Sequence, residues 1–133
     1  MLNKLKQNWR ENWLLCINRL TSFDLQIKMW LDQSGNNPHW SYSEFMCCYI
    51  DDLDIDDDYA SAMQDKLITP DEFRLIRIWH EALRNYSNTI KDVYDHQAIL
   101  EDPKWLGIVN LGLNQKIKLA EIVSVAERSY LMR

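Results

Sequence analysis

Apolar side chains recur every three or four residues along most of this chain, and that spacing predicts α-helices. The first such stripe, within residues 2–20, consists of Leu2, Leu5, Trp9, Trp13, Cys16 and Leu20. Thr21 and Ser22 then supply a stop and a new cap, and residues 25–31 predict a short second helix. No stretch alternates apolar and polar residues for long enough to indicate a β-strand.

The next predicted helix is the most continuously apolar part of the sequence. Ser41 and Glu44 have the spacing of a capping box, in which two side chains satisfy free backbone N–H groups at a helix start. The unbroken apolar run FMCCYI follows. One helical stripe through it consists of Met46, Tyr49, Ile50 and Leu53. Because Phe45 and Cys48 add apolar surface away from this stripe, residues 41–53 predict a buried central helix.

Helix start signals are also clear in the second half of the chain. Thr69, Pro70 and Glu72 combine a cap, a proline at the first helical position and the glutamate of a capping box. The stripe after them consists of Phe73, Ile76, Trp79, Leu83 and Tyr86. Residues 85–92 are mostly polar and indicate a loop that ends this helix.

Shorter segments complete the pattern. Residues 59–66 predict one short helix, and Asp95 is placed to cap another that ends at residue 101. Asp102 and Pro103 open the last helical region, residues 103–131, in which Gly107 and Gly112 leave one helix or two possible. Two helices are favoured, because a new stripe begins beyond Gly112 with Leu119, Ile122, Val123, Ala126 and Tyr130.

These elements predict an all-α protein: a single irregular bundle of six to eight helices around the buried central helix. A length of 133 residues fits one domain that buries enough surface to fold without disulfides or metal. Only three glycines and three prolines argue against a turn-rich β sandwich. Residues 34–38, with the sequence SGNNP, predict a loop before the central helix.

Charge is unevenly distributed around a net value of −5. Six carboxylates lie within eight residues directly after the predicted central helix: Asp51, Asp52, Asp54, Asp56, Asp57 and Asp58. Residues 44–72 hold ten acids and one base, whereas residues 1–20 and 103–133 each carry a net charge of +3. Such an acidic centre would repel phosphates, so it argues against nucleic-acid binding and suits a protein partner with a basic surface.

Three interpretations of the acidic run differ in what they require. A calcium loop starting at Asp54 needs glycine at its sixth position, where Tyr59 stands, and one starting at Asp52 would place Met63 at a ligand position. A solvated connection between helices is the simplest interpretation. A partner-facing patch is the third, and Leu53 and Ile55 favour it because they can anchor the segment between its charges.

Motifs for metal binding or catalysis are missing from the sequence. Cys47 and Cys48 are adjacent rather than spaced as zinc ligands, and no second histidine follows His80 in the pattern of a metalloprotease helix. His80 lies beside an apolar stripe, where a partly buried, hydrogen-bonded role fits better than a metal-binding one. No glycine-rich phosphate loop and no local nucleophile–base pair are present. We therefore predict a non-enzymatic protein without metal or cofactor.

Three cysteines, two of them in a predicted buried helix, fit a reducing compartment. The chain opens with no signal-peptide pattern, and no apolar run approaches the ~18 residues of a membrane span. A cytoplasmic protein that does not enter membranes is the resulting expectation.

Three segments of the sequence stand out together: NPHWSYSEFM at residues 37–46, WHEAL at 79–83 and YDHQAILEDPKW at 94–105. Over residues 30–110 the chain resembles the small bacterial immunity proteins of contact-dependent growth inhibition systems. The resemblance implies a cytoplasmic protein that binds and neutralises the C-terminal toxin domain, often a nuclease, of a matching large surface protein. It supplies no contact residues by position.

Candidate partner-binding residues therefore come from the chain itself. The acidic run would supply steering and salt bridges, with Tyr59 at its end. Aromatic and histidine residues beside loops or helix starts are candidate contacts, namely Trp40, His80, Tyr94, Asp95, His96 and Trp105. Two other classes stay open: a regulatory or scaffold module that binds a basic partner, and a small hydrolase whose residues meet only in the fold.

Overall fold

The computed structural model describes residues 2–31 and 41–132, and within these ranges every regular element is an α-helix. The all-α prediction is therefore confirmed, and the described ranges contain eight helices. They are α1 (Leu2–Leu20), α2 (Phe23–Trp30), α3 (Tyr42–Ile50), α4 (Ala60–Gln64), α5 (Pro70–Thr89), α6 (His96–Glu101), α7 (Pro103–Ile122) and α8 (Val125–Leu131).

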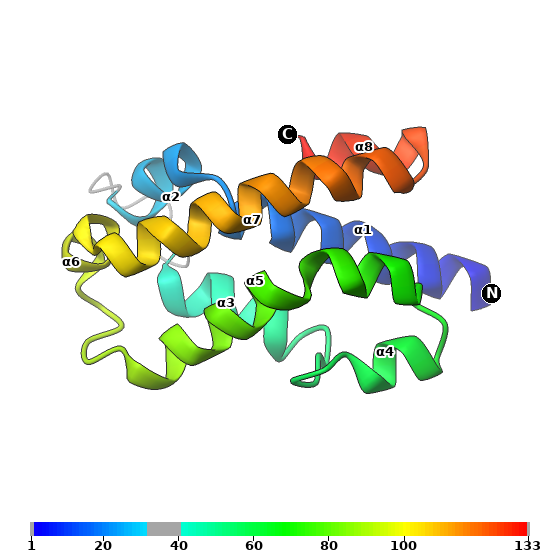
Figure 1. The fold of residues 1–133 in the computed structure, drawn as a ribbon, viewed down its shortest axis with the longest axis horizontal. Coiled ribbons are helices and arrows are strands. Elements are labelled where there is room, and N and C mark those ends of the chain that lie inside the picture. Colours follow the sequence, from blue (N-terminus) through cyan, green and yellow to red (C-terminus); the bar gives the residue numbers. More distant parts are fainter. Residues whose placement is uncertain (1, 32–40, 133) are drawn as a thin grey trace.

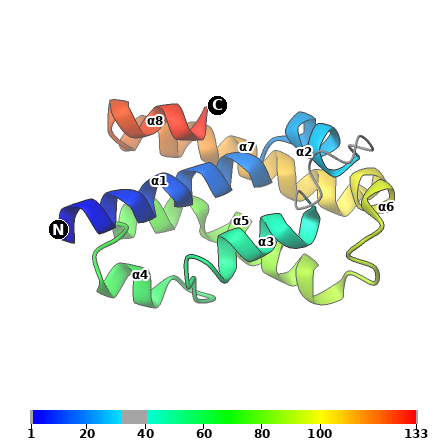
Figure 2. The same cartoon turned by 180° about the vertical axis from the view of Figure 1, so that it is seen from behind.

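Three long helices, α1, α5 and α7, form the frame of the bundle (Figure 1). Helix α5 packs along α7, and α1 packs against α2, α3, α7 and α8. Seen from either side, α3 and α4 lie below α1, while α2, α7 and α8 lie above (Figures 1 and 2). The underside of the bundle is therefore formed by α3, α4, the connection between them and one face of α5.

Large aromatic side chains fill the core. Those without measurable exposure include Trp13, Trp79 and Trp105, and the helix predicted as central, α3, adds four buried side chains: Tyr42, Phe45, Met46 and Tyr49. Trp105 packs against Trp30 and Tyr42, with ring centroids 5.9 and 5.5 Å apart. These buried residues belong to one contiguous cluster, as expected for a single hydrophobic core.

Gly112 lies in the middle of α7, not at a break between two helices. A Cβ atom at this position would lie 2.5 Å from Thr21 Cγ2 and 2.5 Å from Trp79 Nε1. Glycine is thus needed for close packing rather than for helix termination. The region does form two helices, but they separate at Val123 and Ser124, where Ser124 begins a capping box with Glu127.

Helix starts follow the predicted caps more closely than helix ends do. Ser41, Thr69, Asp95 and Asp102 each accept a hydrogen bond from a backbone N–H of the helix that follows.

Several predicted boundaries are wrong, including both ends of the short helix predicted at residues 59–66, which spans Ala60–Gln64 as α4. Helix α5 continues to Thr89 through the segment predicted as polar loop, because polar residues there lie on its exposed side. Helix α3 ends at Ile50, three residues before the predicted end. Helix α2 starts at Phe23 rather than at residue 25, because Ser22 is its N-cap.

A buried ion cluster ties the first helix to the last. The Arg10 guanidinium of α1 donates to Glu72 of α5 (2.9 and 2.7 Å) and to Glu127 of α8 (2.6 and 3.2 Å). It also donates to the carbonyl oxygen of Leu67 (2.8 Å). Burial alone would lower the pKa of Arg10, but the two carboxylates outweigh burial and raise it. Arg10 therefore remains charged and holds three helices together.

Candidate partner-binding surface

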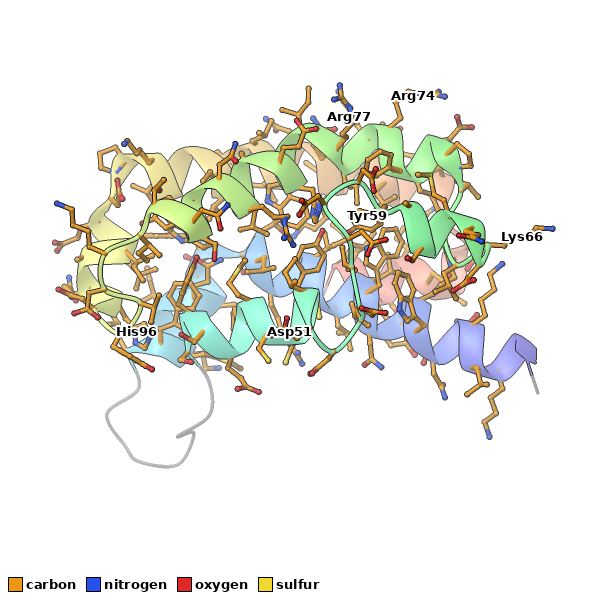
Figure 3. The ribbon with its side chains drawn as sticks, turned by 90° about the horizontal axis from the view of Figure 1, so that it is seen from below. Asp51, Tyr59, Lys66, Arg74, Arg77 and His96 are labelled. Atoms are coloured by element: carbon orange, nitrogen blue, oxygen red, sulfur yellow. The ribbon has the colours of Figure 1, made fainter. Side chains whose placement is uncertain are left out.

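The predicted acidic run forms an ordered connection between α3 and α4, which we call the acidic loop (residues 51–59). It crosses the underside of the bundle between α3 and α5 (Figure 3). Its apolar residues, Leu53, Ile55 and Tyr59, are 8%, 5% and 0% exposed. Its exposed carboxylates are Asp51, Asp52, Asp54, Asp57 and Asp58, and Asp56 is half-buried. The loop therefore has an anchored apolar side and a charged outer side.

Two side-chain donors fix the backbone of the acidic loop. Trp9 Nε1–H donates to the carbonyl oxygen of Leu53 (3.1 Å), and His80 Nε2 lies 3.2 Å from the carbonyl oxygen of Asp56. Because a carbonyl oxygen only accepts, the second contact requires a proton on Nε2. His80 therefore holds the loop as a hydrogen-bond donor from α5.

Behind His80 a chain of hydrogen bonds runs through the core. His80 Nδ1 lies 2.8 Å from the Tyr49 hydroxyl, which contacts the Tyr59 hydroxyl, and Trp13 Nε1–H donates to Tyr59 (3.0 Å). With the His80 proton on Nε2, Tyr49 donates to Nδ1, Tyr59 donates to Tyr49, and each hydroxyl has both a donor and an acceptor partner. Each hydrogen bond in this series is donated in the direction of Asp56. One neutral tautomer of His80 therefore satisfies every polar atom in the series.

Burial keeps the members of this chain neutral. Desolvation lowers the pKa of His80 to about 4, because the cation would be removed from water. Desolvation likewise raises the pKa of Tyr49 and of Tyr59, so neither hydroxyl ionises near neutral pH. The acidic loop thus rests on uncharged polar groups.

The loop also contains unusual backbone conformations. Asp54 and Tyr59 have φ values of 53° and 58°, in the left-handed region. Asp occupies this region with little difficulty, whereas a bulky aromatic residue rarely does. Tyr59 adopts this conformation where its ring is fully buried and its hydroxyl joins the core chain. Tertiary contacts thus compensate for the local backbone strain.

Three of the six carboxylates have partners on α4 or α5. Asp56 accepts from Ser61 N–H (2.8 Å), and Asp57 pairs with Arg84 Nη2 (2.6 Å). Asp58 accepts from Ala60 N–H (3.1 Å). The hydrogen bonds from Ser61 lower the pKa of Asp56. Asp51, Asp52 and Asp54 are also exposed. The Cys47 and Cys48 thiols of α3 interact with Asp51 and Asp52.

Three predicted contact residues lie in the core instead. Tyr59, His80 and Trp105 have no exposed surface, so the prediction that they touch a partner is corrected. Tyr59 and His80 support the acidic loop from inside, whereas Trp105 donates from Nε1 to Gln26 Oε1 (2.9 Å) and packs among aromatic rings.

The other predicted contacts lie away from the acidic loop. Tyr94 is 79% exposed, and Asp95 is exposed at the N-cap of α6. His96 accepts from the backbone N–H of Tyr42 (3.4 Å), at the start of α3, whereas Asp51 follows the end of that helix (Figure 3). Nine helical residues separate these ends by about 13 Å. Trp40 lies outside the described residues.

A cleft beside the acidic loop was missed by sequence reasoning. It has a volume of about 280 Å³ and lies between α3 and the second half of α5. Its lining includes Tyr42, Met46, Ile50, Asp51, Arg84, Ser87, Asn88 and Val93. The polar composition of residues 85–92 predicts a loop, so no pattern indicates that Ser87 and Asn88 line a cleft from a helix.

The described residues contain three free thiols and no group of metal-ligating side chains. Across residues 2–31 and 41–132, no three His, Cys, Asp or Glu side chains are placed to hold a metal ion. All three thiols are free, and burial raises the pKa of Cys16 to about 12 and that of Cys48 to about 11. A raised pKa leaves little reactive thiolate at neutral pH.

Comparison with protein-family models, with curated proteins and with solved structures finds no match to this chain. Among the described helices, none has the length and apolar character needed to cross a membrane.

Proposed function

We propose that this protein is an inhibitor that binds a basic protein surface through its acidic loop. The supporting observation is the combination of five exposed carboxylates on the loop with a backbone anchored from inside by Trp9 and His80. A solvated connection would not need two side-chain donors beneath it and a buried aromatic residue with positive φ. The anchoring therefore favours the partner-facing interpretation of the acidic run.

Anchoring matters for binding because ordering a loop on contact costs free energy. Each mobile side chain immobilised at an interface costs about 0.5–1.5 kcal/mol, and a pre-ordered backbone avoids the additional cost of ordering the main chain. The charges contribute differently, by raising the rate of productive encounters with a basic partner. A fixed acidic loop can supply both fast association and slow dissociation.

The resemblance at residues 37–46, 79–83 and 94–105 suggests what the basic partner is. We propose a toxin domain of a contact-dependent growth inhibition effector, with a nuclease as the best-fitting class, because a cleft that binds nucleic acid is basic. In this role the chain acts as an immunity protein in the cytoplasm of the cell that makes it.

The test uses the C-terminal domain of the large effector whose gene is expected beside that of this protein. A variant with Asp51, Asp52 and Asp54 replaced by Asn is compared with a control in which three exposed acids elsewhere become amides. The control substitutions are Asp24→Asn, Glu101→Gln and Glu121→Gln. Both variants lose three negative charges, so net charge alone cannot explain a difference between them.

Surface-binding kinetics should separate the two variants. We expect the loop variant to associate about tenfold more slowly at low salt, with the difference shrinking as salt rises, and the control to stay near wild type. Cells that express the toxin domain should be protected by the control and less well by the loop variant. Equal rates and equal protection for both variants would refute binding through the acidic loop.

A further inference from the structure

The cleft between α3 and α5 joins the acidic loop at Asp51, which belongs to both. Its volume of about 280 Å³ is below the roughly 300–1,000 Å³ typical of small-molecule sites. A single inserted side chain suits this size better than a cofactor or metabolite. Because Asp51 belongs to both the loop and the cleft lining, a segment lying on the loop can reach the cleft.

The charges around the cleft favour a cation. Arg84 is the one base in its lining, and its charge is neutralised by Asp57, at 2.6 Å. An adjoining cavity shares Arg84 and Asn88 with the cleft and adds Glu81. Glu81 pairs in turn with Arg77 (3.3 Å), so Asp51 is what gives the two cavities a net negative charge before the rest of the acidic loop is counted.

The remaining lining suits a long side chain with several N–H donors. Met46, Ile50 and Val93 give an apolar wall for an alkyl stem. Asn88 offers an amide oxygen. The Tyr42 hydroxyl is buried and has no hydrogen-bond partner with standard distance and angle. Burial raises the pKa of Tyr42, and the nearby Ser87 side chain offsets part of this rise. A buried polar group without a partner is rare and costly, so an incoming donor would be favourable.

We propose that this cleft receives an arginine side chain from the basic partner, with its stem against Met46 and Ile50 and its guanidinium beside Asp51. Arginine fits better than lysine because its planar, weakly hydrated guanidinium presents several donors at once to the acceptors around the cleft. The proposal rests on the proposed function, because the partner segment is the one that lies on the acidic loop. Arginine is also among the residues that most often anchor protein interfaces.

The test uses the full chain and two small probes, followed by two-dimensional amide NMR. The probes are N-acetyl-arginine amide and its neutral isostere N-acetyl-citrulline amide. We expect saturable shifts at Ile50, Ser87 and Val93 with the arginine probe, and several-fold weaker binding of the citrulline probe. Matched variants are Asp51→Asn in the cleft and Asp54→Asn on the loop, where asparagine tolerates the positive φ.

Asp51→Asn should weaken binding of the arginine probe by about three- to fivefold, whereas Asp54→Asn should leave it nearly unchanged. Equal binding of both probes, equal effects of both variants, or shifts confined to the acidic loop would each overturn the cleft proposal. None of these results depends on the toxin domain. The NMR test of the cleft and the kinetic test of the acidic loop can therefore fail independently. Conversely, failure of that kinetic test together with arginine-specific shifts in the cleft would overturn the proposed partner while retaining the arginine site.

Discussion

Replacing His80 with Gln should remove a specific loss of stability in mild acid. His80 is fully buried and donates to the carbonyl oxygen of Asp56, and desolvation lowers its pKa to about 4. In the unfolded chain a histidine has a pKa near 6.5. Between these values the unfolded state binds a proton that the folded state does not, so stability falls as pH is lowered.

The size of the effect follows from the two pKa values. At pH 5 an unfolded histidine is almost fully protonated, whereas buried His80 is still mostly neutral. Moving from pH 7.5 to pH 5 should therefore reduce the free energy of unfolding by about 2 kcal/mol through this residue alone. Protonation inside the fold would also place two donors, Nδ1–H and the Tyr49 hydroxyl, against each other.

Urea unfolding followed by circular dichroism, at pH 7.5 and at pH 5, measures this quantity. His80→Gln keeps a donor for Asp56 but does not titrate, so its own cost is the same at both pH values. The fall in unfolding free energy should be about 2 kcal/mol smaller in the variant than in wild type. His96 is present in both proteins and cancels in the difference. Equal falls in the two proteins would refute the buried, neutral state of His80.

Two further pairs of variants test the packing. Gly112→Ala should destabilise the fold by about 1–3 kcal/mol, because its Cβ would lie within 3 Å of buried atoms, whereas Gly107→Ala, with open space around it, should be neutral or stabilising by up to ~1 kcal/mol. Chemical denaturation measures both, and similar effects of the two would contradict the close approach at Gly112. Glu127→Gln should cost about 1–3 kcal/mol because Arg10 loses a buried charged partner, while Glu81→Gln, which breaks an exposed pair, should cost less than about 1 kcal/mol. A Glu127 variant as stable as the Glu81 variant would show that the buried cluster adds no net stability.

Local chemistry made helix starts predictable from the sequence. A cap such as Thr69 bonds to backbone groups two or three residues away. The cap and its partners are therefore close together in the sequence, where a local pattern reveals them. Helix ends carried less information. The polar residues after Leu83 have the composition of a loop, yet they continue α5 because its other face packs on α7. Gly112 was misread for the same reason, since the contact that requires it comes from Trp79, 33 positions earlier.

The outer side of the candidate surface was predictable, whereas its support was not. Six aspartates in eight residues indicate an exposed segment whatever the fold. The hydrogen bonds that shape it join Trp13, Tyr49, Tyr59 and His80 across separations of 10 to 46 residues. Each of these residues fitted an apolar stripe or a loop edge when viewed alone. Only the packing of α1, α3 and α5 brings their polar atoms within hydrogen-bonding distance of one another.

The internal support of the acidic loop links recognition to the folding of the whole protein. Trp9 and Trp13 come from α1, Tyr49 from α3 and His80 from α5, so the loop has its shape only when all three helices are docked. During synthesis the aspartates leave the ribosome before His80 does, and a nascent chain presents charge without the fixed backbone. A partner selective for the shaped loop would ignore such incomplete chains. Binding of such a partner would in turn stabilise the complete fold, and more so as the partner concentration rises. A cell that makes much of the partner would therefore also retain more of the folded protein.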